Sequence, residues 1–203
     1  MKKFLAFDCS GEEIIIGVHN AKEYVEIREV ASGTENLLPN IDKLLKKAKL
    51  KISDIEVVCV GVGPGSWTGA RVGVVTAYGF SEGIKDLKFV QFNSFDLISY
   101  NGNEKNKVLK IVKAYANFVY IQKPNGEIVA ITKDELLKEY KEYTIVGCTK
   151  VTENTLVVPL DLQTVAVNKI TQEDFVDIDE IEPMYLRLSQ AEYQREQRLK
   201  GGK

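Results

Sequence analysis

The 203-residue sequence lacks the residues that several classes of binding and catalytic site require. It has 27 Lys and Arg against 29 Asp and Glu, without the basic surplus by which an independent nucleic-acid-binding protein displaces counterions. If nucleic acid is involved, we expect a partner to supply most of the contacts. His19 is the one histidine, which argues against a metal site built from several histidines and against a Ser-His-Asp triad.

Cysteines and long apolar runs are equally scarce. Cys9, Cys59 and Cys148 are far apart and form no CxxC pair, so they are interpreted as buried thiols of a reducing compartment and not as zinc or redox ligands. The apolar stretch in MKKFLAFDCSGEE is too short for a signal peptide or a membrane span. We therefore expect a soluble, cytoplasmic protein, and predict no metal ligands.

The first third of the sequence predicts three strands and then an amphipathic helix. KFLAFD (3–8) and IIIGV (14–18) are apolar runs, and EYVEIREVA (23–31) alternates with a period of two, as a half-buried strand does. After Thr34, a candidate N-cap, apolar residues recur at helical spacing. These apolar residues are Leu37, Leu38, Ile41, Leu44, Leu45 and Ala48.

The next segments predict a buried strand, a glycine-bearing helix and a further strand. EVVCVGV (56–62) is almost entirely apolar, and a helix is expected from its N-cap Ser66 to about Gly83. Glycines at 69, 73 and 79 weaken this helix, which is tolerated where another backbone must approach closely. KFVQF (88–92) predicts a strand and NSFDLISY (93–100) a short helix.

The polar stretch NGNEKN (101–106) marks a predicted domain boundary, after which the strand pattern restarts. VLKIVKAY, NFVYIQK, EIVAI and YTIVGC predict strands, Thr132 caps a helix through KDELLKEY, and LQTVAVNKI predicts another helix. The chain is therefore predicted to repeat a β-β-β-α-β-α unit, the second copy shorter. Its parts are an N-terminal subdomain (1–102), a smaller C-terminal subdomain (103–188) and a polar tail (189–203).

The glycine-rich segment GVGPGSWTGARVG (61–73) allows two interpretations. A strand, a glycine-rich loop and a helix can aim backbone N–H groups at an anion, but the segment lacks the lysine of a P-loop and the acidic residue of a dinucleotide fold. Asp8, Ser10, Gly65 and Ser66 are candidates for such an anion or nucleotide site. The alternative is a close-packed turn, in which Asp8 and Ser10 bond to nearby backbone amides.

Several motifs resemble those of the TsaB (YeaZ) family. GVGPGSWTGARVG is similar to the family pattern G-x-G-P-G-S-F-T-G-L-R-x-G, FLAFDCSGEE resembles its opening strand and turn, and EPMYLRLSQAE resembles its closing P-x-Y-L-R motif. SGTENLLP resembles the family's H-S-E-x-L-L-P. Four positions depart from these patterns: Gly33, Thr34, Trp67 and Ala70 stand where the family usually has His, Ser, Phe and Leu.

The resemblance implies an α/β fold of the actin-like ATPase (acetate kinase/Hsp70/actin) superfamily. It also implies a non-catalytic partner of the transferase TsaD, acting with the ATPase TsaE to form N6-threonylcarbamoyladenosine at position 37 of tRNAs that read codons beginning with A. The family is thought to pair with TsaD, or with itself, through its first two helices, here 35–49 and 66–83. The resemblance also implies that the chain contacts tRNA only through the complex and has no cofactor of its own. Binding of ATP or ADP at the partner interface stays open as an alternative.

The predicted partner face combines residues of both helices: Leu38, Pro39, Asp42, Leu45, Arg71, Val75, Tyr78 and Gly79. A working ATPase of this superfamily clamps its nucleotide between two hairpins, and VGCTKVTENT offers no recognisable second clamp. Independent ATP hydrolysis is therefore not expected. Three alternatives remain at this point: a small-molecule kinase or ATPase of the same superfamily, a metalloprotease, and a homodimeric binding module.

Overall fold

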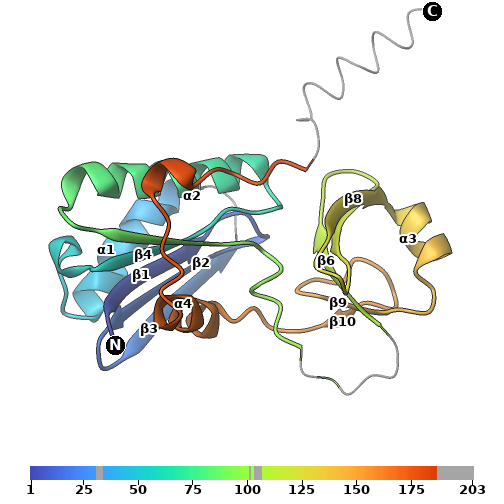
Figure 1. The fold of residues 1–203 in the computed structure, drawn as a ribbon, viewed down its shortest axis with the longest axis horizontal. Coiled ribbons are helices and arrows are strands. Elements are labelled where there is room, and N and C mark those ends of the chain that lie inside the picture. Colours follow the sequence, from blue (N-terminus) through green and yellow to red (C-terminus); the bar gives the residue numbers. More distant parts are fainter. Residues whose placement is uncertain (31–33, 101, 103–106, 187–203) are drawn as a thin grey trace, which may run out of the picture.

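The computed structural model describes residues 1–30, 34–100, 102 and 107–186, and Figure 1 draws the remainder as a grey trace. The first half forms a five-stranded sheet in the order β3-β2-β1-β4-β5, antiparallel from β1 to β3 and parallel across β1, β4 and β5. Its strands are β1 (Lys3–Asp8), β2 (Glu13–Asn20), β3 (Tyr24–Val30), β4 (Val57–Gly61) and β5 (Lys88–Phe92).

The second half forms another five-stranded sheet with the same strand order, β10-β9-β6-β7-β8. Its strands are β6 (Val108–Lys113), β7 (Phe118–Gln122), β8 (Ile128–Thr132), β9 (Thr144–Gly147) and β10 (Leu156–Val157). Helix α3 (Lys133–Glu139) follows β8 and is capped by Thr132, as predicted. Between β9 and β10, where the first half has a long helix, residues 148–155 form turns. The predicted repeat is confirmed, with one helix missing from the second copy.

Two helices cover one face of the first sheet: α1 (Leu37–Lys47), on β2 and β3, and α2 (Trp67–Gly83), on β1 and β4. The apolar stripe of α1 packs into the main core with the sheet. Three 3-10 turns stand beside these helices: η1 (Thr34–Asn36), η2 (Ile52–Asp54) and η3 (Ile178–Glu180). The predicted N-cap at Thr34 is wrong, because Thr34 opens η1 and Asn36 occupies the cap position of α1 without a side-chain cap bond.

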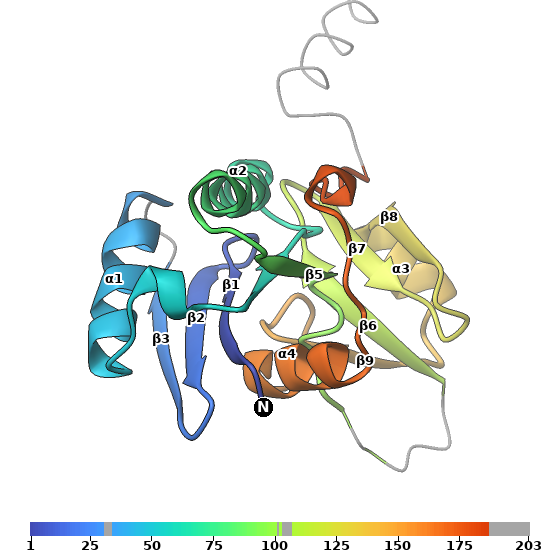
Figure 2. The same ribbon diagram turned by 60° about the vertical axis from the view of Figure 1, so that its left-hand side comes forward.

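Helix α4 (Leu162–Thr171) covers the opposite face of the first sheet, as Figure 2 shows. Leu162, Ala166 and Ile170 pack among Phe4, Cys59 and other buried residues of that face. The chain then crosses to the α2 side, where Ile181 enters the main core. The sequence assigned residues 103–188 to the second subdomain, whereas α4 and the segment after it pack on the first sheet.

The segment 93–100, predicted to be a helix, instead forms a turn and an isolated bridge. The Asn93 side chain accepts hydrogen bonds from the backbone N–H groups of Phe95 and Asp96, and Asp96 accepts one from the Asn93 N–H. Such local side-chain bonds compete with helix formation. The turn places Phe95 and Ile98 in a buried cluster with Val112 and other residues of the second sheet, and so joins the two subdomains. The predicted boundary at 101–106 lies almost wholly outside the described residues, as does the tail from 189.

Candidate functional site

The glycine-rich loop between β4 and α2 lies directly on the turn that follows β1. The Ser66 N–H donates to the Ser10 carbonyl at 2.7 Å. A Cβ on Gly65 would lie 2.1 Å from that carbonyl oxygen, and a Cβ on Gly69 would lie 1.8 Å from the Cys9 oxygen. Ser66 caps α2 by accepting from the Gly69 N–H at 3.1 Å, as predicted. The glycines at 65 and 69 are therefore required for close contact between two backbones.

The candidate anion-site residues do meet in space, around a buried network of hydroxyl groups. Asp8 and Ser10 are each 2% exposed, Gly65 is half-buried and Ser66 is exposed. The Ser10 hydroxyl lies 2.8 Å from Asp8 Oδ1 and 2.9 Å from the hydroxyl of Ser94, which is also buried. Burial raises the pKa of the Asp8 carboxyl, and hydrogen bonds from Ser10 and Cys9 oppose that rise. Ser94 was not predicted, because its segment was assigned to a helix. Whether an anion binds here stays a prediction.

An ion pair joins the first hairpins of the two sheets. Lys113, at the end of β6, is bonded to Glu12, in the turn between β1 and β2. Cys148, in the turn after β9, lies near Asp8 and Glu12, and burial raises the pKa of its thiol. The ends of β1, β6 and β9 therefore lie together at the boundary between the two subdomains.

Most of the predicted partner residues lie on the surface of α1 and α2. Leu38 is 57% exposed and Val75 62% exposed; Pro39, Asp42, Arg71 and Gly79 are also exposed. The inclusion of Leu45 is wrong for an exposed face, because its side chain is 6% exposed and belongs to the core under α1. Tyr78 is half-buried and packs against the same core.

An aromatic stack connects the glycine-rich loop with the C-terminal P-x-Y-L-R motif. Trp67, the first residue of α2, stacks on Tyr185 with ring centroids 4.0 Å apart and planes 18° apart. Arg71 Nε donates to the Tyr185 hydroxyl at 3.3 Å, and the Met184 N–H donates to the Val62 carbonyl at 2.8 Å. Tyr185 was not among the predicted site residues, although both motifs were noted separately.

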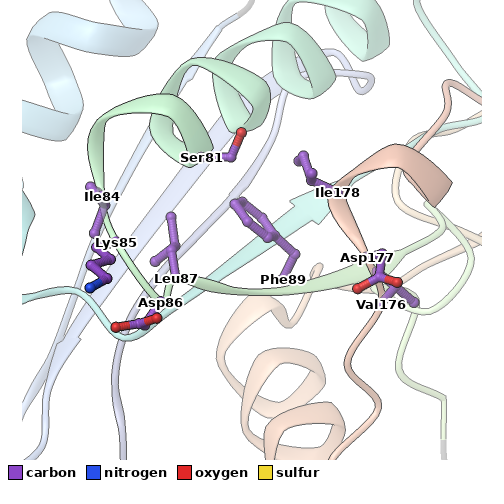
Figure 3. A pocket seen from close by; sticks show the side chains of 9 residues that line it. All are labelled: Ser81, Ile84, Lys85, Asp86, Leu87, Phe89, Val176, Asp177 and Ile178. Carbon is purple, nitrogen blue, oxygen red and sulfur yellow. The ribbon is translucent and has the colours of Figure 1, made fainter.

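A pocket of about 280 Å³ lies at the far end of α2, between the start of β5 and residues 176–178 (Figure 3). Phe89 forms its buried floor, and none of the predicted site residues lines it. Among the described residues, no group of three or more His, Cys, Asp and Glu side chains could hold a metal ion. None of the helices in the described ranges is both long and apolar enough to cross a membrane.

Comparisons with known proteins identify the family. Residues 29–140, more than half of the chain, match the family described as TsaD: tRNA N6-adenosine threonylcarbamoyltransferase. Similar curated proteins carry the name tRNA threonylcarbamoyladenosine biosynthesis protein TsaB. The chain belongs to this TsaD-like family, as a TsaB (YeaZ) member.

Two TsaB relatives and one solved structure show how far the similarity extends. The TsaB of Buchnera aphidicola subsp. Baizongia pistaciae is 26% identical over 166 residues, 72% of this chain and 75% of the relative. The Haemophilus influenzae TsaB is 30% identical over 121 residues, 57% of this chain and about half (51%) of the relative. The structure of YeaZ from Pseudomonas aeruginosa aligns with 92% of this chain and 100% of that one, with a TM-score of 0.73 and 18% identity. This similarity shows the fold, an actin-like arrangement of two α/β subdomains.

Proposed function

We propose that this TsaB-family chain takes part in tRNA threonylcarbamoyladenosine biosynthesis as a non-catalytic scaffold and activating subunit. The product is N6-threonylcarbamoyladenosine at position 37 of tRNAs reading codons that begin with A. A TsaD-like subunit transfers the threonylcarbamoyl group from threonylcarbamoyl-adenylate, and a TsaE-like ATPase acts with it. This chain contacts tRNA only through that complex, in the cytoplasm. The names of the curated relatives support the pathway.

The observation that carries this proposal is the apolar surface of the α1–α2 pair. Both helices lie on one face of the first sheet, and Leu38 and Val75 expose more than half of their side-chain surface there. A partner that covers both helices would remove these two large apolar side chains from water. A TsaD-like protein of the same fold, or a second copy of this chain, is the occupant we propose.

The ends of the first hairpins support a non-catalytic role. An ATPase of this fold holds phosphate groups between two hairpins, one from each subdomain. In this chain, Glu12 in the first of these turns pairs with Lys113 at the end of β6, and the Asp8 carboxyl is hydrogen-bonded to Ser10. Glu12 and Asp8 therefore each have a partner within the chain, the first in an exposed ion pair and the second in a buried hydrogen bond.

Reconstitution tests the proposal directly. tRNA threonylcarbamoylation is measured with purified TsaD-like and TsaE-like subunits, with and without this chain, and we expect product formation to depend on the chain. Full activity in its absence contradicts the proposal. Phosphate release from ATP by the chain alone would favour the alternative, a kinase or ATPase of the same superfamily.

The partner face has its own test in Val75→Asp. Because Val75 is exposed, an aspartate at this position should leave the monomer folded. It should weaken pairing by at least tenfold, because the carboxylate would lose its water when the partner covers it. Leu137→Asp is the matched control, since Leu137 is 51% exposed on α3 of the other subdomain. Pairing is measured by analytical ultracentrifugation. Equal effects of the two variants would show that the α1–α2 face is not the interface.

A further inference from the structure

Three short contacts between oxygen atoms run from Asp8 to the glycine-rich loop. Asp8 Oδ1 lies 2.8 Å from Ser10 Oγ. Ser10 Oγ lies 2.9 Å from Ser94 Oγ. Ser94 Oγ lies 2.8 Å from the Pro64 carbonyl oxygen. All three side chains are buried, with at most 6% of their surface exposed.

These three contacts require three protons, and the two hydroxyl groups supply two. The Pro64 carbonyl only accepts, so the Ser94 hydroxyl must donate to it. The Ser10 hydroxyl has a single proton, which can serve either Asp8 or Ser94. If it serves Asp8, the Ser10 and Ser94 oxygens face each other at 2.9 Å without a proton, which leaves a buried contact between two acceptors. If it serves Ser94, the third proton must come from the Asp8 carboxyl.

We propose that Asp8 is a neutral carboxylic acid in the folded protein at neutral pH. It is the first donor in a chain of hydrogen bonds that runs through Ser10 and Ser94 to the Pro64 carbonyl. Asp8 is then a positioning residue: its proton holds the two hydroxyl groups in one direction, and they hold the loop from which α2 begins. This inference goes beyond the proposed function and does not depend on it.

The surroundings of Asp8 favour the neutral form. A Cβ on Gly61 would lie 2.5 Å from Asp8 Oδ1, so the backbone of β4 closes the carboxyl on that side. The titratable groups that interact with Asp8 are the thiols of Cys9 and Cys148, and the carboxylates of Glu12 and Glu13 lie near Cys148. No Lys or Arg of the described residues is among the groups that act on Asp8. No cation of the described residues therefore compensates a charge on this carboxyl, and the hydrogen bonds from the backbones of Ser10 (3.0 Å to Oδ1) and Cys9 offset its burial only in part.

The sign of the pH dependence follows from burial. In the unfolded chain the Asp8 carboxyl has its ordinary pKa of 3.8, and burial raises the pKa in the fold. The contribution of Asp8 to stability is therefore fully present below the unfolded pKa. It is lost as the pH rises through the folded pKa. Asp8→Asn removes this dependence, because an amide N–H can donate to Ser10 at every pH.

The first test needs no variant. The carboxyl carbon of Asp8 is followed by 13C NMR from pH 4 to pH 9, and we expect the chemical shift of a protonated acid at pH 7. An Asp8 that is ionised at pH 7 overturns the proposal. The second test uses Ser94→Ala, which frees the Ser10 proton for Asp8. The carboxyl should then ionise at lower pH than in the parent chain, although its burial is nearly unchanged, and an unchanged titration overturns the hydrogen-bond chain.

Urea unfolding of Asp8→Asn provides a third readout. At pH 8, the urea midpoint of Asp8→Asn should equal or exceed that of the parent chain. Between pH 5 and pH 8, the midpoint of the parent chain should fall relative to the midpoint of Asp8→Asn. Asp179→Asn is the control, because Asp179 is an exposed carboxylate whose loss should leave the pH dependence unchanged. An Asp8→Asn chain that loses stability relative to the parent as the pH rises contradicts a neutral Asp8.

Discussion

At the scale of single residues, two glycines of α2 show how differently the same residue type can be used. Gly69 faces the turn after β1, where a Cβ would lie 1.8 Å from the Cys9 oxygen and 2.8 Å from its carbonyl carbon. Gly79 has nothing within 4 Å of the same position and is exposed. One glycine is required by a backbone contact, and the other leaves an open surface on the predicted partner face.

We expect Gly69→Ala and Gly79→Ala to shift stability in opposite directions. Gly69→Ala should lower the free energy of unfolding by about 1–3 kcal/mol or more, because the backbone of the β1 turn must move away. Gly79→Ala should raise it by about 0.5–1 kcal/mol, since alanine is the better helix former. Urea unfolding of both variants checks this, and a neutral Gly69→Ala would contradict the close contact.

Single residues could be predicted from sequence where their partners are local. Ser66 and Thr132 were identified as N-caps because each bonds to a backbone N–H three residues later, and this spacing is visible in the sequence. Ser94 bonds to Ser10, 84 positions away, and to Pro64, 30 positions away. No local pattern encodes those contacts, so this residue of the site was missed.

At the scale of elements, the stack of Trp67 on Tyr185 connects the start of α2 with the segment after η3. The two residues are 118 positions apart in the sequence, and their rings stack with centroids 4.0 Å apart and planes 18° apart. Offset stacking contributes about 0.5–1.5 kcal/mol beyond the buried area. The position of this C-terminal segment and the position of the loop are therefore energetically coupled.

A double-mutant cycle measures that coupling. Trp67→Ala and Tyr185→Ala should each destabilise the chain, and the double variant should lose less than the sum of the two by about 0.5–1.5 kcal/mol. Free energies of unfolding come from urea titrations of the four proteins. Trp67→Ala combined with Leu137→Ala serves as an uncoupled control, because Leu137 lies on α3, which packs on the second sheet. Additive effects of the Trp67 and Tyr185 changes would contradict the coupling.

Helices and strands were predicted well where the apolar pattern extends over many residues. They were predicted poorly where polar side chains determine the local backbone conformation. The stripe from Leu37 to Ala48 and the apolar run of β4 identified a helix and a buried strand correctly. NSFDLISY has a helix-like spacing of apolar residues, yet the Asn93 side chain takes the first backbone N–H groups and bends the chain. Thr34 failed as an N-cap for a related reason, because a 3-10 turn precedes α1.

At the scale of the whole molecule, the decisive feature is that α4 returns from the second subdomain to the first sheet. It covers a face that includes Phe4, Cys59 and Val90, all fully buried. The repeated succession of strands and helices was predictable from the restart of the strand pattern after residue 106, although the strand order within each sheet was not predicted. The return of α4 to the first sheet was not predictable. The apolar stripe of Leu162, Ala166 and Ile170 indicates that one face of α4 is buried, but it does not identify the sheet that buries it.

The fragment 1–102, predicted from sequence as a subdomain, should therefore not fold by itself. Uncovering a large apolar side chain costs about 1.5–3 kcal/mol, and whole domains are stable by about 5–15 kcal/mol. Loss of α4 exposes several such side chains at once. We expect a poorly dispersed 1H–15N NMR spectrum for fragment 1–102 and a dispersed one for a chain ending at residue 186, which retains α4 and η3.

Mixing experiments complete this comparison. Adding a fragment of residues 107–186 to fragment 1–102 should restore dispersion in part, because it supplies α4. A well-dispersed spectrum of fragment 1–102 alone would show that the face under α4 tolerates water, and would contradict the packing argument.

The position of Ile181 in the main core also sets an order of events during synthesis. Phe4 and Leu5 leave the ribosome first, but the core that buries Leu5 includes Ile181, and the opposite face that buries Phe4 requires α4. The first subdomain therefore cannot be completed until residue 181 has emerged. Contacts of such long sequence separation slow folding, so the second sheet, whose strands and α3 all lie within residues 108–157, has time to form first.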